Sequence, residues 1–343
     1  MMLTFALLSF MTASPAAATL APTAPAAVPV KLSAVTASLR LDDYYFDSTL
    51  KKVVVPGGAL GKILFVDADS HDVSSIDIFT PPKNDTGTAG GLTSLDAGEG
   101  LIFVVNRSDR KLYVADPAEN DAQKRIIASA PLAAVPDFIR YVSPTRELWV
   151  TEPKKNQIEV FSISASTAMR PITPVQEVLI PSTHGEYESL VIDASRKRAY
   201  SNQESSTVAI DLQTKRIVAT WKNGCKEATG LALDDARGFL IVACREGRAV
   251  VLDVRDGHSV SSLKTGEGVD IIAYSPEKQM VYLPAAKSAT VTYASLSEAG
   301  ELKEVAKSNS AKGAHCVVVD QSGGSWVCDG AAGRLLYFPP LED

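Results

Sequence analysis

Short apolar strands alternate with polar turns along most of this chain, and the alternation repeats at a fixed period. One sequence repeat, called the phrase below, begins at residues 188–193, 229–234 and 270–275. It consists of an apolar strand, a polar turn with small residues, Gly or Pro, and a second apolar strand. These first strands end 41 residues apart in each step. A constant period of this length is typical of repeat architectures.

Weaker copies of the phrase precede and follow these three. They begin at Asp42, Gly91, Asp137 and His315, which brings the total to seven copies at spacings of 41 to 51 residues. Each copy also holds a third strand, and most show a fourth, as at residues 216–221. Four strands per copy predict the blades of a β-propeller. Long helical periodicities are missing, so a Rossmann fold or an α/β barrel has no support.

The two ends of the repeat complement each other. The last copy stops at Phe338 after its third strand, whereas residues 28–41 carry a spare strand pattern before the first copy. Pairing that segment into the last blade would close the circle and protect open sheet edges. We therefore predict an all-β, seven-bladed β-propeller with four-stranded antiparallel blades, closed by an N-terminal strand in the last blade.

The first 30 residues carry no charge. An apolar run followed by Ala16, Ala17 and Ala18 resembles a secretory signal with a small-residue cleavage site. The run is too short to span a membrane, and no later segment is apolar enough to do so. We predict a signal peptide at 1–18, an Ala/Pro-rich spacer at 19–29 and a propeller domain at 30–343, in a periplasmic or secreted protein. A disordered Ala/Pro tail is the alternative.

The net charge restricts the classes of possible partners, and the cysteine content bears on the cellular compartment. The net charge is −6 without a basic block, so we expect no nucleic acid among the partners and predict a monomer that binds a small molecule or a protein. Cys225 and Cys244 lie at strand ends that share one edge, and Cys316 and Cys328 lie on the two arms of one hairpin. Two disulfides are thus geometrically reasonable, but three connectivities and buried free thiols stay open.

The repeat also predicts which residues face the central channel. The first strand of a propeller blade lies innermost, so equivalent residues at its start should line one mouth of the channel. These positions hold Asp42, Gly91, Asp137, Glu188, Thr229, Asp270 and His315. The second strands end on the same face. Our candidate ligand-binding residues at the channel mouth are Asp137, Glu188, Asp270, His315, Glu152, Asn202 and Asn106.

Like charges that face each other across a channel must bind protons or hold a cation. Oxygen ligands suit Ca²⁺ or Mg²⁺, and an imidazole leaves room for a transition metal. Glu188, Asp270 and His315 are therefore candidate metal ligands. The alternative is a wet polar channel whose groups bind only water and neighbouring amides.

Several phrases resemble the bacterial YVTN-type (YncE-like) seven-bladed β-propellers. Residues 190–193 (LVID), 198–202 (RAYSN) and 230–234 (GLALD) carry the likeness, which covers about residues 42–340. The resemblance implies the propeller fold and an exported binding or surface protein, and it implies no particular chemistry.

A metal-dependent lactonase-like hydrolase or lyase in the channel is the competing function. Gluconolactonase-like propellers use Glu, Asn and Asp around a divalent metal, and streptogramin-lyase propellers use His and Glu near a metal. The chain offers these residue types, as in Glu188 and His315, without either family's motif at matching positions. No Gly-x-Ser-x-Gly elbow occurs, and the Cys316 side chain should point away from His315.

Overall fold

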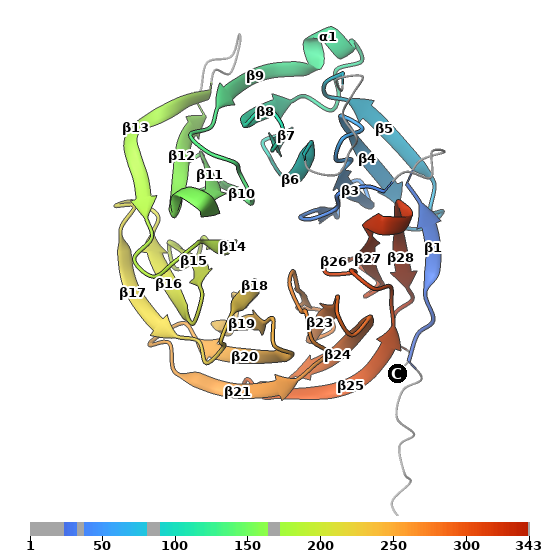
Figure 1. Ribbon diagram of the computed structural model, residues 1–343, viewed down its shortest axis with the longest axis vertical. Helices are drawn as coiled ribbons and strands as arrows, with labels where there is room; N and C mark the ends of the chain where they lie inside the picture. Colours follow the sequence, from blue (N-terminus) through green and yellow to red (C-terminus); the bar gives the residue numbers. More distant parts are fainter. Residues whose placement is uncertain (1–23, 33–37, 81–89, 164–171, 342–343) are drawn as a thin grey trace, which may run out of the picture.

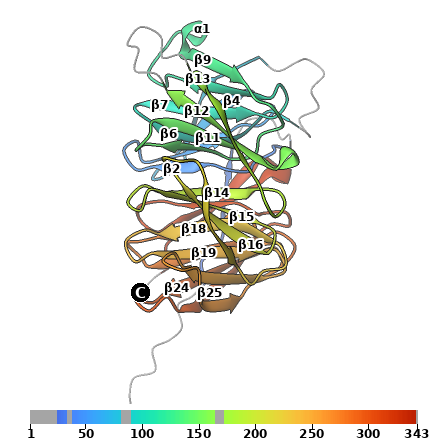
Figure 2. The same ribbon diagram turned by 90° about the vertical axis from the view of Figure 1, so that its left-hand side faces the viewer.

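The computed structural model describes residues 24–32, 38–80, 90–163 and 172–341. These residues form seven four-stranded antiparallel sheets arranged as blades around a common centre (Figure 1), and Figure 2 shows the ring from its edge. The all-β, seven-bladed propeller is thereby confirmed. The signal peptide expected at 1–18 and part of the spacer fall on residues 1–23, outside the described residues.

Six blades are meanders of four consecutive strands, and the last blade adds the N-terminal strand to three consecutive ones. The first strand of each meander lies innermost (Figure 1). Blades one to three contain β2 (Tyr45–Asp47), β3 (Lys52–Pro56), β4 (Lys62–Asp67) and β5 (Val73–Asp77); β6 (Leu92–Gly98), β7 (Leu101–Asn106), β8 (Lys111–Ala115) and β9 (Ile126–Pro131); and β10 (Ile139–Val142), β11 (Glu147–Glu152), β12 (Gln157–Ile163) and β13 (Ile172–Pro181).

The later blades follow the same order. They contain β14 (Glu188–Asp193), β15 (Arg198–Gln203), β16 (Ser206–Asp211) and β17 (Ile217–Lys222); β18 (Ala228–Asp234), β19 (Phe239–Cys244), β20 (Arg248–Asp253) and β21 (Ser259–Lys264); β22 (Ala273–Ser275), β23 (Met280–Ala285), β24 (Thr290–Leu296) and β25 (Leu302–Asn309); and β26 (Val317–Val319), β27 (Ser325–Asp329) and β28 (Arg334–Phe338).

Helices are short and lie only between strands in the described residues. They are α1 (Ala122–Arg125), η1 (Pro153–Lys155) and η2 (Gly330–Ala332). None of the described helices is long and apolar enough to cross a membrane.

The N-terminal strand completes the last blade, as expected. Strand β1 (Val28–Lys31) pairs antiparallel with β28, with Val30 opposite Leu335 (Figure 1). It starts two residues before the predicted beginning of the propeller domain at residue 30. Because β1 covers the outer edge of β28, both ends of the described chain are held in one sheet.

The core lies between the blades. Buried side chains gather into one apolar cluster at each of the seven blade interfaces formed by the described residues. Burial follows the strand alternation: Val53 and Val55 pack toward the last blade, and Val54 packs toward the second. This two-sided burial explains why the second strands, such as β3 and β19, consist of nearly continuous apolar runs.

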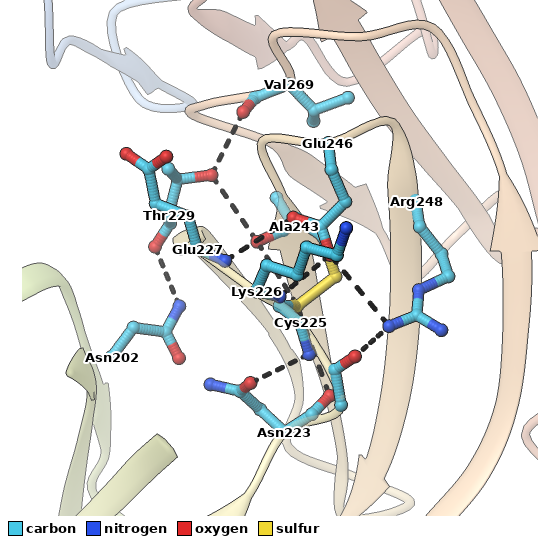
Figure 3. The surroundings of a disulfide bond; sticks show 12 residues. Asn202, Asn223, Cys225, Lys226, Glu227, Thr229, Ala243, Glu246, Arg248 and Val269 are labelled. Atoms are coloured by element: carbon cyan, nitrogen blue, oxygen red, sulfur yellow. Dashed lines mark hydrogen bonds and ion pairs between the residues drawn. A yellow bond between two sulfur atoms is a disulfide. The ribbon is translucent and has the colours of Figure 1, made fainter. Parts of the chain in front are cut away.

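The cysteines pair as Cys225–Cys244 and Cys316–Cys328, so no free thiol is left. Figure 3 shows the first disulfide joining the loop before β18 to the end of β19. The side-chain oxygen of Asn223 accepts a hydrogen bond from the Cys225 backbone N–H at 3.0 Å. The disulfide therefore holds a loop at the same end of the blade as the channel mouth.

A recurring turn contacts the neighbouring blade on the face opposite the channel mouth. In blade four, Lys215 follows the turn-capping Asp211 and lies 5.5 Å from the ring centre of Trp149 in blade three. In blade one, His71 occupies the matching position and packs edge-on against Trp326 of the last blade at 5.0 Å. Each turn thus covers a buried tryptophan of the preceding blade.

Candidate ligand site at the channel mouth

The first residues of the inner strands meet at one end of the channel, because all seven inner strands run in the same direction. Glu188 opens β14, and Asp137, Asp270 and His315 lie just before β10, β22 and β26. The backbone N–H of Ile271 donates to the carbonyl of His315 at 2.9 Å, which fixes Asp270 beside His315. These side chains share one cavity of about 270 Å³, whose lining is completed by Arg40, Asp42, Arg107, Val135, Phe138, Pro153, Lys154 and Glu186.

Several charges of this cavity neutralise one another. Arg107 contacts Asp137 at 2.8 Å, and Lys154 contacts Glu186 at 2.7 Å. The Arg107–Asp137 pair is the better shielded, because its side chains are 21% and 17% exposed. The mouth is consequently a mixed-charge surface.

His315 is held as a cation. Its Nδ1 donates to the Gly313 carbonyl at 2.8 Å, while its Nε2 faces an Asp42 oxygen at 3.7 Å. Burial opposes the charge, but Asp42, then Asp270 and the Gly313 carbonyl, outweigh it and raise the pKa of His315 to about 9. At neutral pH both ring nitrogens therefore carry protons.

Glu188 and Asp270 differ from the other acids, because no hydrogen bond or ion pair of their carboxylates is found among the described residues. Burial, with the Asp270 charge next, raises the pKa of Glu188 to about 7. Burial also raises the pKa of Asp270 to about 6, although His315 and Arg245 oppose the shift. Both groups face the cavity with unused acceptor oxygens.

Asp137 is the most strongly perturbed carboxyl group of the mouth. Burial, followed by the charges of Asp42 and Glu188, raises the pKa of Asp137 to about 8 despite the Arg107 guanidinium. The pKa values of Asp137, Glu188 and Asp270 therefore lie between about 6 and 8 instead of near 4. Perturbed groups that converge on a cavity mark a candidate binding site.

Three of the seven expected residues do not line this cavity. Asn106 accepts the Ser108 N–H at 2.9 Å, and Glu152 accepts the Ala134 N–H at 2.7 Å. Asn202 donates to the Thr229 carbonyl at 2.7 Å, as Figure 3 shows. All three side chains are buried and support neighbouring backbone.

Sequence reasoning missed the cations of the mouth. Arg107 directly follows Asn106 at the end of β7, and Arg245 directly follows Cys244 at the end of β19. In blades two and three the residue beyond the second strand, Arg107 or Pro153, lines the mouth, and the last residue of the strand does not. Arginine recurs at this position, and the Arg245 charge lowers the pKa values of Glu188 and Asp270 from outside the cavity lining.

Metal ligation by Glu188, Asp270 and His315 stays a prediction. In the described part of the chain, one set of three His, Cys, Asp or Glu side chains has all its ligand atoms within 4.8 Å: His315, Cys316 and Cys328. Both sulfurs of that set are in a disulfide and lack the thiolate that binds metals. The Cys328 sulfur lies 3.8 Å from His315 Nδ1.

A second cavity of about 320 Å³ lies deeper in the channel. Aliphatic and aromatic residues of the inner strands provide most of its lining, including Leu231, Ile271 and Val318. The charged residues of this cavity, Arg140 and Asp43, pair with each other: Arg140 donates to both Asp43 oxygens at 2.5 and 2.9 Å. Phe138 lines both this cavity and the mouth.

A larger hollow of about 660 Å³ lies at the opposite face, between the first and last blades. It is lined by residues that include Phe46, His71 and Tyr337. Its buried acid, Asp320, already accepts hydrogen bonds from its own turn and from Trp326. The channel mouth, with its unpaired carboxylates, is therefore the stronger candidate.

No protein-family model matches the chain, and no curated protein matches it. Among solved structures, a chain of "Crystal Structure of Mitotic Checkpoint Complex" aligns with a TM-score of 0.72 and 12% identity, covering 99% of this chain and 100% of that one. "Streptogramin B lyase structure" aligns with a TM-score of 0.69 and 13% identity, covering 94% of this chain and 100% of that one. At these identities the likeness shows the fold alone: a seven-bladed β-propeller with propeller-type structural neighbours.

Proposed function

We propose that this chain is an exported binding protein whose channel mouth holds a positively charged group of a small molecule or protein partner. The observation that carries the proposal is the pair Glu188 and Asp270, two carboxylates that line the mouth cavity and make no hydrogen bond or ion pair with the described residues. An ammonium group between them would supply the missing hydrogen-bond donors. It would also relieve their mutual repulsion.

The titration of the mouth makes this binding pH-dependent. A bound cation favours the ionised carboxylates, whose pKa values in the free protein are about 7 for Glu188 and about 6 for Asp270. Binding therefore releases protons, and affinity for an amine should rise as the pH increases from about 6 to 8.

Export and membership of the YVTN-type propellers are parts of the same proposal. Two disulfides account for all four cysteines, and structural disulfides persist mainly in oxidising compartments. The uncharged apolar start of the sequence supports a secretory signal. We propose a periplasmic or secreted monomer.

The first test uses the smallest probe of the site, ethylamine, with its neutral analogue N-ethylacetamide. Binding to the full chain at pH 8 would be measured by NMR titration for the wild type and for the double variant Glu188→Gln/Asp270→Asn. We expect ethylamine alone to bind the wild type, and the double variant to weaken it at least about tenfold, as expected for loss of charged hydrogen bonds.

A matched control removes one Asp and one Glu charge from the opposite face. Asp235 and Glu301 are exposed in turns there, so Asp235→Asn/Glu301→Gln should leave the titration unchanged. Equal amine binding by all three proteins, or none by the wild type, would overturn the proposal. Ca²⁺ or Mg²⁺ binding that replaces amine binding, and that is lost in the double variant, would instead favour the metal-dependent hydrolase or lyase.

A further inference from the structure

The cavity below the mouth indicates the chemical character of the part of the ligand that follows its charged group. This inference rests on the proposed function. The inner strands carry both layers: four mouth residues, Asp42, Asp137, Glu188 and Asp270, are each followed directly by a residue that lines the deeper cavity. Glu188 is followed by Ser189, and Asp270 by Ile271. Phe138 lines both cavities, so a ligand seated at the mouth would reach the lower layer past its ring.

The lower layer offers little to a second charged group. Asp43 accepts hydrogen bonds from Arg140 and, at 2.5 Å, from the Ser94 hydroxyl, so its charge is already paired. The Arg140 guanidinium also donates to the Ile139 carbonyl at 2.7 Å. The remaining side chains are mostly aliphatic or aromatic, such as Leu231 and Leu233. Burial of a charged ligand group there would lack a partner.

We propose that the site takes an amphipathic amine: an ammonium group bound by Glu188 and Asp270, joined to an alkyl or aryl chain that passes Phe138 into the channel. The volumes of about 270 and 320 Å³ lie at the lower end of the range of small-molecule pockets. Burial of the chain adds hydrophobic affinity to the ionic contact. A free amine and the lysine side chain of a partner share this chemistry.

The test is a series of primary amines, ethylamine, butylamine, hexylamine and 4-phenylbutylamine, titrated into the full chain at pH 8 by calorimetry or NMR. We expect affinity to rise with chain length by up to about fourfold per methylene, the ratio that corresponds to burial of one CH₂ group. N-acetyl-lysine N-methylamide enters the same series as the probe for a protein source. Tighter binding of this probe than of hexylamine would assign the shared chemistry to a partner's lysine.

A channel-filling variant separates the chain from the ammonium group. Ala273 is half-buried in β22 and lines the deeper cavity but not the mouth, so Ala273→Leu should reduce the gain from butylamine to hexylamine while ethylamine binds as before. Val318→Leu makes the same test from β26 if the first variant does not fold. Wild-type affinity independent of chain length would overturn this inference alone. If the wild type bound none of the amines, the proposed function would be overturned as well.

Discussion

Carboxyl groups of similar burial behave differently at this mouth because of their immediate neighbours. Asp137 contacts Arg107, and Asp42 faces both His315 and Arg40, whereas Glu188 makes no ion pair with the described residues. A charge that is partly desolvated and unpaired destabilises the folded protein. Removing such a charge should therefore increase stability, in contrast to the usual effect of altering an ion pair.

We expect Glu188→Gln to raise the free energy of unfolding at pH 8 by about 1 to 3 kcal/mol, allowing for partial exposure of the side chain. The pKa of Glu188 is about 7 in the folded protein and near 4.5 when unfolded, so between these values only the folded state binds the proton. Wild-type stability falls as the pH rises through this window. Urea unfolding at pH 4, 6 and 8 checks this; an equal difference at each pH would contradict it.

Glu301→Gln is the control, because it removes the same charge from an exposed turn. Its unfolding free energy should follow that of the wild type at each pH.

At the scale of elements, blade contacts depend on the turn between the third and fourth strands. Lys215 contacts Glu147 at 2.6 Å, with both side chains close to buried, and the same Glu147 oxygen accepts the Trp149 indole N–H at 3.0 Å. The turn of blade four thus completes a polar network inside blade three. The first blade uses the ring of His71 on Trp326 in the same place.

Loss of the Lys215 charge should leave Glu147 buried without its cation. We expect Lys215→Met to lower the free energy of unfolding by about 2 to 4 kcal/mol, whereas Lys222→Met, at an exposed position of β17, changes it by less than about 0.5 kcal/mol. The double variant Lys215→Met/Glu147→Gln should recover part of the loss. Denaturant titration of these proteins together with the single variant Glu147→Gln measures the coupling, and strictly additive losses would refute it.

At the scale of the whole molecule, the ring is closed by the pairing of β1 with β28, which joins the two ends of the described chain in one sheet. Val30 of β1 is buried against the last blade, and Val28 on the same strand is 43% exposed. Tyr44 adds a contact across the same seam, because its hydroxyl donates to the Trp326 carbonyl at 2.8 Å. The ring therefore closes through both hydrogen bonds and apolar packing.

The difference in burial between the start and the middle of β1 supplies a matched pair of variants. Val30→Asp should lower the free energy of unfolding by about 3 kcal/mol or more, because an unpaired carboxylate replaces a buried side chain. Val28→Asp makes the same chemical change at the exposed start of the strand, on the same face, and should have little effect. Thermal unfolding combined with size-exclusion chromatography compares them, and equal destabilisation would argue against closure by β1.

The repeat, its seven copies and closure by the N-terminal strand were predictable because they depend on local signals. Strand alternation and turn residues recur at a readable period, and the missing fourth strand of the last copy, which stops at Phe338, matched the spare strand before the first. The inner position of Asp137, Glu188, Asp270 and His315 followed from the same count. These features require only that each blade repeats the geometry of the others.

The tertiary structure alone decided which side chains meet and which are paired. A shift of one residue at a strand end places Asn106 in the packed interior and Arg107 at the mouth, and the period of a strand makes that difference decisive. Likewise, sequence left three disulfide connectivities open, because pairing depends on where distant strand ends lie in space. The sequence by itself determined the ring and the positions that face its centre. Folding determined that the Glu188 and Asp270 carboxylates line the mouth without a hydrogen bond or ion pair among the described residues, because the nearby cations His315 and Arg245 are paired with Asp42 and Glu227.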